Sequence, residues 1–203
     1  MEGFSITFKR RKDVTQIKND IARNTKELFA QKGYNATSME EICAINKRSK
    51  GSIYYHFQSK EELFMHLIKL NNEEWINSWL EKEHRYETTV DKLYGLADHY
   101  VDDLANPLNH AINEFVMGQD ISQEMLDDML SLIRIPYITY EKIILQGIER
   151  GELKMEEPED LMYIINGLFN GLSTLYYEKD LEDIRRLYKK GIATILTGIQ
   201  SDQ

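Results

Sequence analysis

Residues 38–57 read SMEEICAINKRSKGSIYYHF, and this stretch decides the fold. Ser38 followed by Glu41 is a capping box, in which the hydroxyl accepts from a backbone N–H and the carboxylate reaches back to the cap, so a helix begins there. Asn46-Lys47-Arg48 indicates a tight turn, and Ser49 caps a second short helix. Two short helices joined by a tight turn have the spacing of a helix-turn-helix.

The second short helix offers hydrogen-bond donors on one side. Ile53 and Phe57 are four residues apart and should face the core of their own unit. Gly51 costs helix stability, about 1 kcal/mol relative to Ala, and suits a close approach of the backbone to a DNA strand. The side chains left for DNA are Lys50, Ser52, Tyr54, Tyr55 and His56. The alternative is that this pair of helices is only an element of the fold.

Helical spacing of apolar residues continues on both sides, and clean period-2 runs are absent, so we expect an all-α protein of about nine helices. Gly33 is placed to end the first helix, and Ser59 opens a long helix. Another long helix should run from about Ser122 to Arg150, kinked or interrupted by Pro136.

We expect two domains. Residues 1–59 form a three-helix DNA-binding unit with a basic N-terminal arm, and residues 60–203 form a larger helical body. No Gly/Ser-rich linker separates them, and a continuous helix is a rigid connection. Motion in one part can therefore reach the other.

Charge is distributed unevenly along the 203 residues, whose formal net charge is −9. Residues 1–60 hold twelve Lys and Arg against six Asp and Glu, whereas residues 61–203 hold thirteen against twenty-eight. A basic segment on an acidic body favours a polyanion as partner of the small part only. The alternative is a chance clustering of solvated charges.

Several classes of function are not favoured. One cysteine excludes a disulfide framework and a cysteine-rich zinc site, and the scattered histidines lack metal-ligand spacing. No apolar run approaches about 18 residues, so no transmembrane helix is expected and the cytoplasm is the default location. We find no catalytic constellation, and we expect neither enzyme activity nor a cofactor or metal.

Residues 29–64 resemble the DNA-binding signature of the TetR family of bacterial transcriptional regulators. The matching pieces are Gly33-Tyr34, Ala36-Thr37-Ser38, Ile42, Ser49-Lys50-Gly51, Ile53-Tyr54, Phe57 and Lys60-Glu61-Glu62-Leu63. The total length and the all-α body fit the same family. The wording YNAT, SKG and YYHF is most similar to a multidrug-sensing member of the family.

The resemblance implies a role for each matching residue. Thr37, Ser38 and Lys60 would contact phosphate, and Ser49, Lys50, Gly51, Ser52, Tyr54, Tyr55 and His56 would lie in the major groove or along its walls. The family often has Ala-Gly-Val in the turn, where this chain has residues 46–48; Arg48 would reach DNA instead of filling the buried place of that valine. The basic residues 9–12 form either an arm that touches DNA or a disordered, solvated tail.

The body should carry a ligand pocket. It is rich in aromatic residues, and Tyr137 and Tyr140 share a helix face beside Pro136, where an imperfectly packed helix can form a pocket wall. The resemblance further points to Trp75, Glu114, Tyr140, Asn170 and Thr174. A carboxylate near such rings would suit a lipophilic cation. A neutral or anionic lipophile remains open, as does an ordinary aromatic core.

Together these features predict a homodimeric repressor that pairs through its last two helices. It would bind a palindromic double-stranded operator and would be released by a small lipophilic inducer. Two alternatives remain: a helical small-molecule-binding or interaction protein without a DNA function, and a regulator whose ligand promotes DNA binding.

Overall fold

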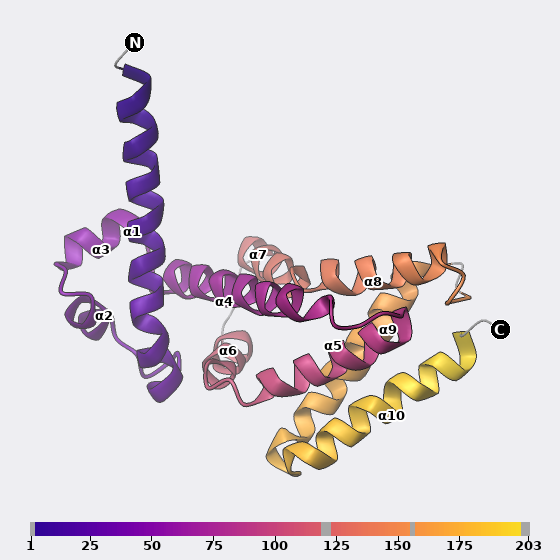
Figure 1. The fold of residues 1–203 in the computed structure, drawn as a ribbon. Coiled ribbons are helices and arrows are strands. Elements are labelled where there is room, and N and C mark those ends of the chain that lie inside the picture. Colours follow the sequence, from indigo (N-terminus) through magenta and orange to yellow (C-terminus); the bar gives the residue numbers. More distant parts are fainter. Residues whose placement is uncertain (1–2, 119–122, 155–156, 200–203) are drawn as a thin grey trace. The chain divides into compact units, whose positions relative to one another are not determined.

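The computed structural model describes residues 3–118, 123–154 and 157–199, and it leaves out the side chains of residues 3–13, 123, 124, 126 and 199. The described residues form ten α-helices and one short 3-10 helix, and no strand (Figure 1). The elements are α1 (Gly3–Lys32), α2 (Met39–Ile45), α3 (Lys50–His56), α4 (Lys60–Glu83), α5 (Thr89–Leu104), α6 (Leu108–Met117), α7 (Gln123–Arg134), α8 (Tyr137–Glu149), α9 (Pro158–Ser173), η1 (Thr174–Tyr177) and α10 (Leu181–Ile199). The all-α prediction is confirmed.

The packing divides the chain into two compact units, each built from two segments. The N-terminal unit comprises residues 1–73 and 107–132, and the C-terminal unit comprises residues 74–106 and 133–203. The helix α4 is therefore shared by both. The predicted division at residue 59 is a functional one and stays a prediction; the packing places the first part of α4, and α6 and α7, with the helix-turn-helix.

The core of the N-terminal unit is a cluster of four aromatic rings from α1, the loop after it, α4 and α6. Phe29, Tyr34, Phe64 and Phe115 are at most 1% exposed. The ring centroids of Phe29 and Phe64 lie 4.6 Å apart, and those of Tyr34 and Phe115 lie 4.7 Å apart. Such tilted and edge-on pairs are favourable contacts between aromatic rings. They join α6 to the helix-turn-helix, although α6 is distant in sequence.

The core of the C-terminal unit is also aromatic. Trp79, Tyr140, Phe169 and Tyr188 are fully buried, and they come from α4, α8, α9 and α10. The Tyr188 hydroxyl donates to the Phe169 carbonyl at 2.6 Å. Beside this core the carboxylate of Glu83 accepts from Lys92 and Lys142, each at 2.9 Å, so a nearly buried charge is compensated.

Most predicted helix boundaries are confirmed, and so is the predicted interruption at Pro136. Pro136 separates two helices, α7 and α8, because proline cannot continue the hydrogen-bond ladder; this accounts for one helix more than expected. Ser122, the expected start of that helix, lies outside the described residues. The helix α1 already begins at Gly3, so it includes the basic residues 9–12, and their contact with DNA stays a prediction.

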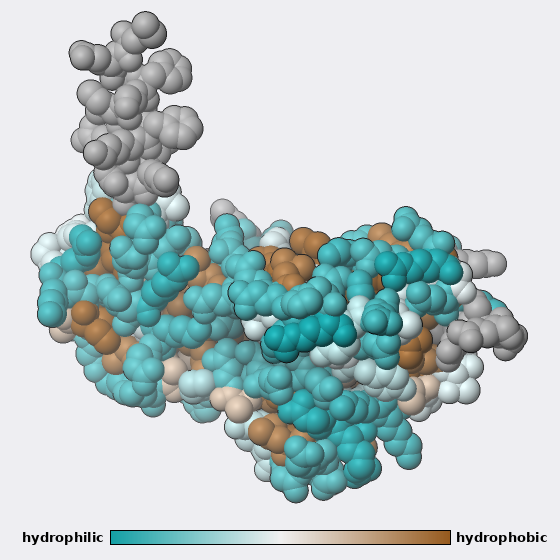
Figure 2. All heavy atoms as spheres, viewed as in Figure 1, coloured by the Kyte–Doolittle hydropathy of each residue, from teal (hydrophilic) through white to brown (hydrophobic). Residues whose placement is uncertain are grey.

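Hydrophilic side chains cover most of the described surface on the face drawn in Figure 2, and brown, apolar spheres occur in small separate patches. Within the described residues no helix combines the length and the apolar composition needed to span a bilayer.

Candidate functional site

Two serine caps set the helix-turn-helix. The Ser38 hydroxyl accepts from the Glu41 N–H, and the Glu41 carboxylate accepts from the Ser38 N–H at 3.0 Å, which completes the predicted capping box. Ser49 caps α3 by accepting from the Ser52 N–H at 3.2 Å. The turn between α2 and α3 contains Lys47 with φ of +51°, a left-handed conformation that few side chains adopt.

The helix α3 is anchored on one side and open on the other. Ile53 and Phe57 are 0% exposed, whereas Tyr55 is 77% exposed. A Cβ added to Gly51 would meet no atom within 4 Å, so the fold itself does not require glycine at this position. The predicted DNA residues Lys50, Ser52, Tyr54 and Tyr55 are on or at the edge of this open side.

Two charged residues flank α3. The Lys50 ammonium lies 3.4 Å from the Glu40 carboxylate, and both side chains are largely exposed, so this ion pair is weak and easily exchanged for a phosphate. The half-buried Arg48 lies near His56, and burial, together with the charges of Arg48 and Lys18, lowers the pKa of His56. His56 is therefore neutral at pH 7, and its Nδ1 is buried without a partner.

Three of the residues predicted to bind phosphate make hydrogen bonds in or next to the loop between α1 and α2. The Thr37 hydroxyl donates to the Gly33 carbonyl at 2.7 Å, and Thr37 is 2% exposed. The Lys60 ammonium donates to the carbonyls of Tyr34 at 2.9 Å and Thr37 at 3.0 Å. Ser38 is engaged in its capping box. These contacts give the three side chains a structural role, and their contact with phosphate stays a prediction that requires Thr37 and Lys60 to change partners.

The C-terminal unit brings four predicted ligand residues and Tyr100 of α5 into one aromatic cluster. The rings of Tyr137 and Tyr140 lie edge-on with their centroids 6.4 Å apart, and the ring centroids of Tyr140 and Phe169 lie 6.1 Å apart. Trp75 lies 6.4 Å from Tyr100, whose hydroxyl donates to Asn170 at 2.9 Å. Burial raises the pKa of Tyr100 to about 12.

The hydroxyl of Tyr140 is the unusual group of this aromatic cluster. Tyr140 is fully buried, and its hydroxyl has no hydrogen-bond partner among the described residues. A buried donor without a partner costs about 1–3 kcal/mol, so the group is available to a ligand or a water molecule. Thr174 instead points its hydroxyl to the Gly171 carbonyl, at 2.8 Å, on the exposed side of η1.

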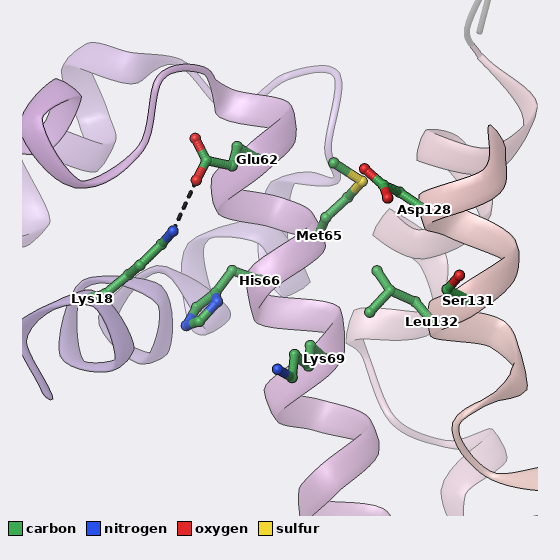
Figure 3. A pocket seen from close by; sticks show the side chains of 8 residues that line it. All are labelled: Lys18, Glu62, Met65, His66, Lys69, Asp128, Ser131 and Leu132. Carbon is green, nitrogen blue, oxygen red and sulfur yellow. Dashed lines mark hydrogen bonds and ion pairs between the residues drawn. The ribbon is translucent and has the colours of Figure 1, made fainter. Parts of the chain in front are cut away.

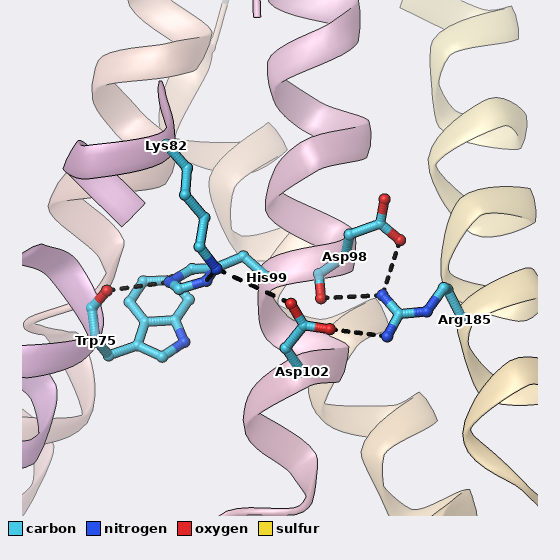
Figure 4. Close-up of polar contacts among 6 residues, drawn as sticks. All are labelled: Trp75, Lys82, Asp98, His99, Asp102 and Arg185. Carbon is cyan, nitrogen blue, oxygen red and sulfur yellow. Dashed lines mark hydrogen bonds and ion pairs between the residues drawn. The ribbon is translucent and has the colours of Figure 1, made fainter. Parts of the chain in front are cut away.

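A polar network lies next to Trp75 (Figure 4). His99 of α5 donates from Nε2 to the Trp75 carbonyl at 3.0 Å, and its Nδ1 lies 3.2 Å from the Lys82 ammonium. Asp102 lies 3.9 Å from Lys82 and accepts from Arg185 of α10 at 2.8 Å. The network links α4, α5 and α10 within the C-terminal unit.

Two family descriptions match the chain and overlap the two sites. Residues 21–67 match bacterial regulatory proteins of the tetR family, and residues 71–201 match the C-terminal region of QacR-like proteins. The chain belongs to the TetR family. The predicted resemblance is confirmed, and as a family member the protein is a transcriptional regulator with a helix-turn-helix.

Relatives support this membership over nearly the whole chain. The transcriptional regulator QacR of Staphylococcus aureus (strain Mu50) is 28% identical over 189 residues, which cover 90% of this chain and 98% of QacR. A TetR-family regulator from Mesorhizobium loti has the same fold, with a TM-score of 0.77, 17% identity and 93% and 98% of the two chains covered. FadR from Bacillus subtilis, solved with stearoyl-CoA, gives a TM-score of 0.72 at 19% identity over 89% and 98%.

Glu114, which is one of the predicted ligand residues, makes contacts with the loop after α1. It belongs to the N-terminal unit, where its carboxylate accepts from the Asn35 N–H at 3.1 Å and lies 3.3 Å from His110. A Cβ on Gly33 would come within 2.5 Å of it. The carboxylate thus fixes the loop after α1, and its contact with a ligand stays a prediction.

The sequence analysis did not identify the residues that pack near the C-terminal end of α3. Lys18 of α1 pairs with Glu62 at 2.8 Å and lies 4.8 Å from the Phe57 ring. His66 hydrogen-bonds Asn19 at 2.8 Å. Lys18, Glu62 and His66 line a pocket of about 280 Å³ in the N-terminal unit (Figure 3). Their partners are more than 40 residues away in sequence, so no local pattern could have found them.

Proposed function

We propose that this TetR-family protein is a homodimeric repressor in the bacterial cytoplasm that binds a palindromic operator through α3. A small lipophilic ligand in the C-terminal unit releases it. Two copies of α3 enter successive major grooves, with half-site centres about 34–36 Å apart or a multiple of that distance. The ligand must bind the released form more tightly than the DNA-bound form, since a ligand with equal affinity for both shifts nothing.

The observation that carries the proposal is the combination of Gly51 with an anchored helix. Ile53 and Phe57 fix α3 to its unit, and the opposite side carries Tyr55 and an open backbone at Gly51. A stable fold gains nothing from glycine inside a helix, and glycine costs about 1 kcal/mol there. A partner surface that approaches the backbone closely, as a DNA strand does, gives this glycine a purpose.

Charge supports the choice of DNA. Lys50 can leave its weak pair with Glu40 for a phosphate, and Arg48 lies next to α3. Each phosphate contact by Lys or Arg releases condensed counterions, so affinity falls as salt rises. Tyr55, Ser52 and backbone N–H groups position the helix without adding charge.

The dimer is supported by one face of α9. Ile164 is 52% exposed, and Gly167 and Gly171 follow it at helical spacing. A Cβ at either glycine would meet nothing within 4 Å, so this stripe is open to close approach by a second helix. The exposed face of α10 is mainly polar, so we assign the centre of the interface to α9 and its rim to α10.

The ligand chemistry follows from Tyr140. The Tyr140 ring lies next to those of Tyr137 and Phe169, and among the described residues no carboxylate or other group forms a hydrogen bond with its hydroxyl. We therefore favour a lipophile with a hydrogen-bond acceptor over a lipophilic cation. A buried polar group that meets its partner only in the complex contributes strongly to specificity.

The test is Gly51→Ala, with Gly198→Ala of α10 as the matched control, because a Cβ at Gly198 also meets no atom within 4 Å. Operator fragments are first selected from random duplex DNA. We expect Gly51→Ala to raise the free energy of unfolding by about 1 kcal/mol and to weaken operator binding at least about tenfold. The Gly198→Ala control should keep full affinity.

Two results would contradict the proposal. Selection without enrichment of a two-fold symmetric motif would support an interaction protein without a DNA function. Unchanged operator affinity in Gly51→Ala would remove α3 from the interface. A ligand that increases operator affinity would instead identify a regulator whose ligand promotes DNA binding.

A further inference from the structure

His99 occupies a position that requires one protonation state. Its side chain is buried in the C-terminal unit, and the residue is 6% exposed. Its Nε2 faces the Trp75 carbonyl, which can only accept, so Nε2 must carry a proton. Its Nδ1 faces the Lys82 ammonium, which can only donate, so Nδ1 must carry a lone pair. Only the neutral imidazole satisfies both partners.

The charged groups around His99 oppose one another. Lys82 of α4 disfavours a second proton on the ring, and Asp102 of α5 favours it. Asp102 is already engaged by Arg185 of α10, at 2.8 Å. Burial is the largest influence and lowers the pKa of His99 below its ordinary value.

The imidazole ring of His99 also contacts both tryptophans of the chain, Trp75 and Trp79. The centroid of the His99 ring lies 4.5 Å from that of Trp75 and 5.7 Å from that of Trp79. One side chain of α5 therefore fixes a backbone carbonyl and two rings of α4, and α4 continues into the N-terminal unit.

We infer that His99 is the positioning residue of Trp75 and a proton-controlled clamp between α4 and α5. As a neutral imidazole it holds the Trp75 carbonyl and accepts from Lys82. A second proton on Nδ1 would face the Lys82 ammonium, so the imidazolium must turn away and Lys82 must move toward Asp102. Acidification then releases Trp75, changes the ligand site and loosens the part of α4 that belongs to the C-terminal unit.

The chain carries its own reporter for this clamp. Both indoles contact the His99 ring, so turning that ring away on protonation changes their surroundings and therefore their emission. We expect tryptophan emission of the full-length, ligand-free protein to change as pH falls from 7.5 to 5, about 1–2 units around the ordinary histidine pKa. Far-UV circular dichroism at each pH verifies that the protein stays folded.

Three variants give the comparison. His99→Gln keeps a donor and an acceptor but cannot titrate, and its emission should not change over this range. Lys82→Gln removes the cation that opposes protonation, so its transition should move to higher pH. Lys179→Gln, an exposed lysine change on the loop before α10, should behave as the unchanged protein.

A separate experiment measures operator affinity, and this experiment rests on the proposed function. Operator affinity should change severalfold over the same pH range in the unchanged protein and stay constant in His99→Gln after both are corrected for general pH effects. Identical pH profiles of emission in the unchanged protein and His99→Gln would overturn the clamp. A transition in emission without any effect on operator affinity would overturn its link to α4 and leave the positioning of Trp75 in place.

Discussion

At the scale of single residues, the partner of a polar side chain decides its role more than its type does. Thr37, Lys60 and Glu114 were predicted from a resemblance to contact phosphate or ligand, and the structure engages all three with the loop after α1. The backbone partners of Lys60 and Glu114 lie at least 23 residues away in sequence, so no local pattern reveals them. Ser38 and Ser49 were predicted correctly because a cap is bonded to the next turn of its own chain.

Two buried tyrosines with different hydrogen bonding give a residue-scale prediction. Tyr140→Phe removes a hydroxyl that has no partner, so we expect the free energy of unfolding to rise by about 1 kcal/mol. Tyr188→Phe leaves the Phe169 carbonyl unpaired and should lower the free energy by about 1–3 kcal/mol. Urea denaturation of both variants measures the difference. Equal effects would mean that the Tyr140 hydroxyl has a partner in solution, such as a bound water.

Protonation of histidine gives a second residue-scale prediction. Burial lowers the folded-state pKa of His99, His66 and His56 below that of the unfolded chain. The unfolded state therefore binds more protons, so stability is full above the ordinary histidine pKa of about 6.5 and is lost as pH falls below it and through the lowered folded-state pKa. His99→Gln should flatten the pH dependence of the urea midpoint between pH 7.5 and 5.5. An unchanged slope would contradict burial as the cause.

At the scale of elements, helix starts and breaks were predictable, and helix pairing was not. Pro136 separates α7 from α8, and Gly33, at φ of +81°, ends α1, as single residues dictate. Even so, the carboxylate of Glu62 accepts from the Gln58 N–H at 2.7 Å and not from its expected partner Ser59. Phe115 of α6 packs against Tyr34 in the loop after α1 and against Phe64 of α4, yet it looks like any other apolar helix residue in the sequence.

The turn of the helix-turn-helix supplies the prediction at this scale. Lys47 adopts φ of +51°, where a side chain costs about 1–2 kcal/mol and glycine costs little. Lys47→Gly should raise the free energy of unfolding by about 0.5–1 kcal/mol, after allowance for the greater entropy of glycine in the unfolded chain. Lys47→Ala keeps the Cβ and should not stabilise. If alanine stabilises as much as glycine, charge and not backbone strain is the cause.

At the scale of the whole molecule, two expected domains and two observed units differ for a physical reason. The first three helices contain the helix-turn-helix, but they do not complete its core. Phe64 of α4 and Phe115 of α6 pack into the same core. The sequence indicates that no flexible linker separates the two parts. It does not indicate which helix, distant in sequence, packs against a given apolar face. Two of the predicted ligand residues, Glu114 and Tyr140, likewise belong to different units.

The assembly supplies a prediction for the whole molecule. Ile164→Glu places a charge on the open stripe of α9 and should convert the proposed dimer to a monomer, with loss of operator binding. Ile138→Glu is the matched control, since Ile138 is 67% exposed on α8 and lies outside the stripe. Light scattering coupled to size-exclusion chromatography measures both masses. A monomeric Ile138→Glu with a dimeric Ile164→Glu would move the interface to α8.

The central claim is that α3 reads DNA, and a pair of tyrosines tests it most directly. Tyr55 on α3 is 77% exposed and Tyr177 on η1 is 72% exposed, so removing either hydroxyl should leave the fold intact. The measurement is the affinity of Tyr55→Phe and Tyr177→Phe for the selected operator, with a scrambled duplex as reference. We predict that Tyr55→Phe loses about tenfold on the operator, because each half-site loses one hydrogen bond, and that Tyr177→Phe loses nothing. Equal affinity of the two variants for the operator would contradict the assignment of α3 as the reading helix.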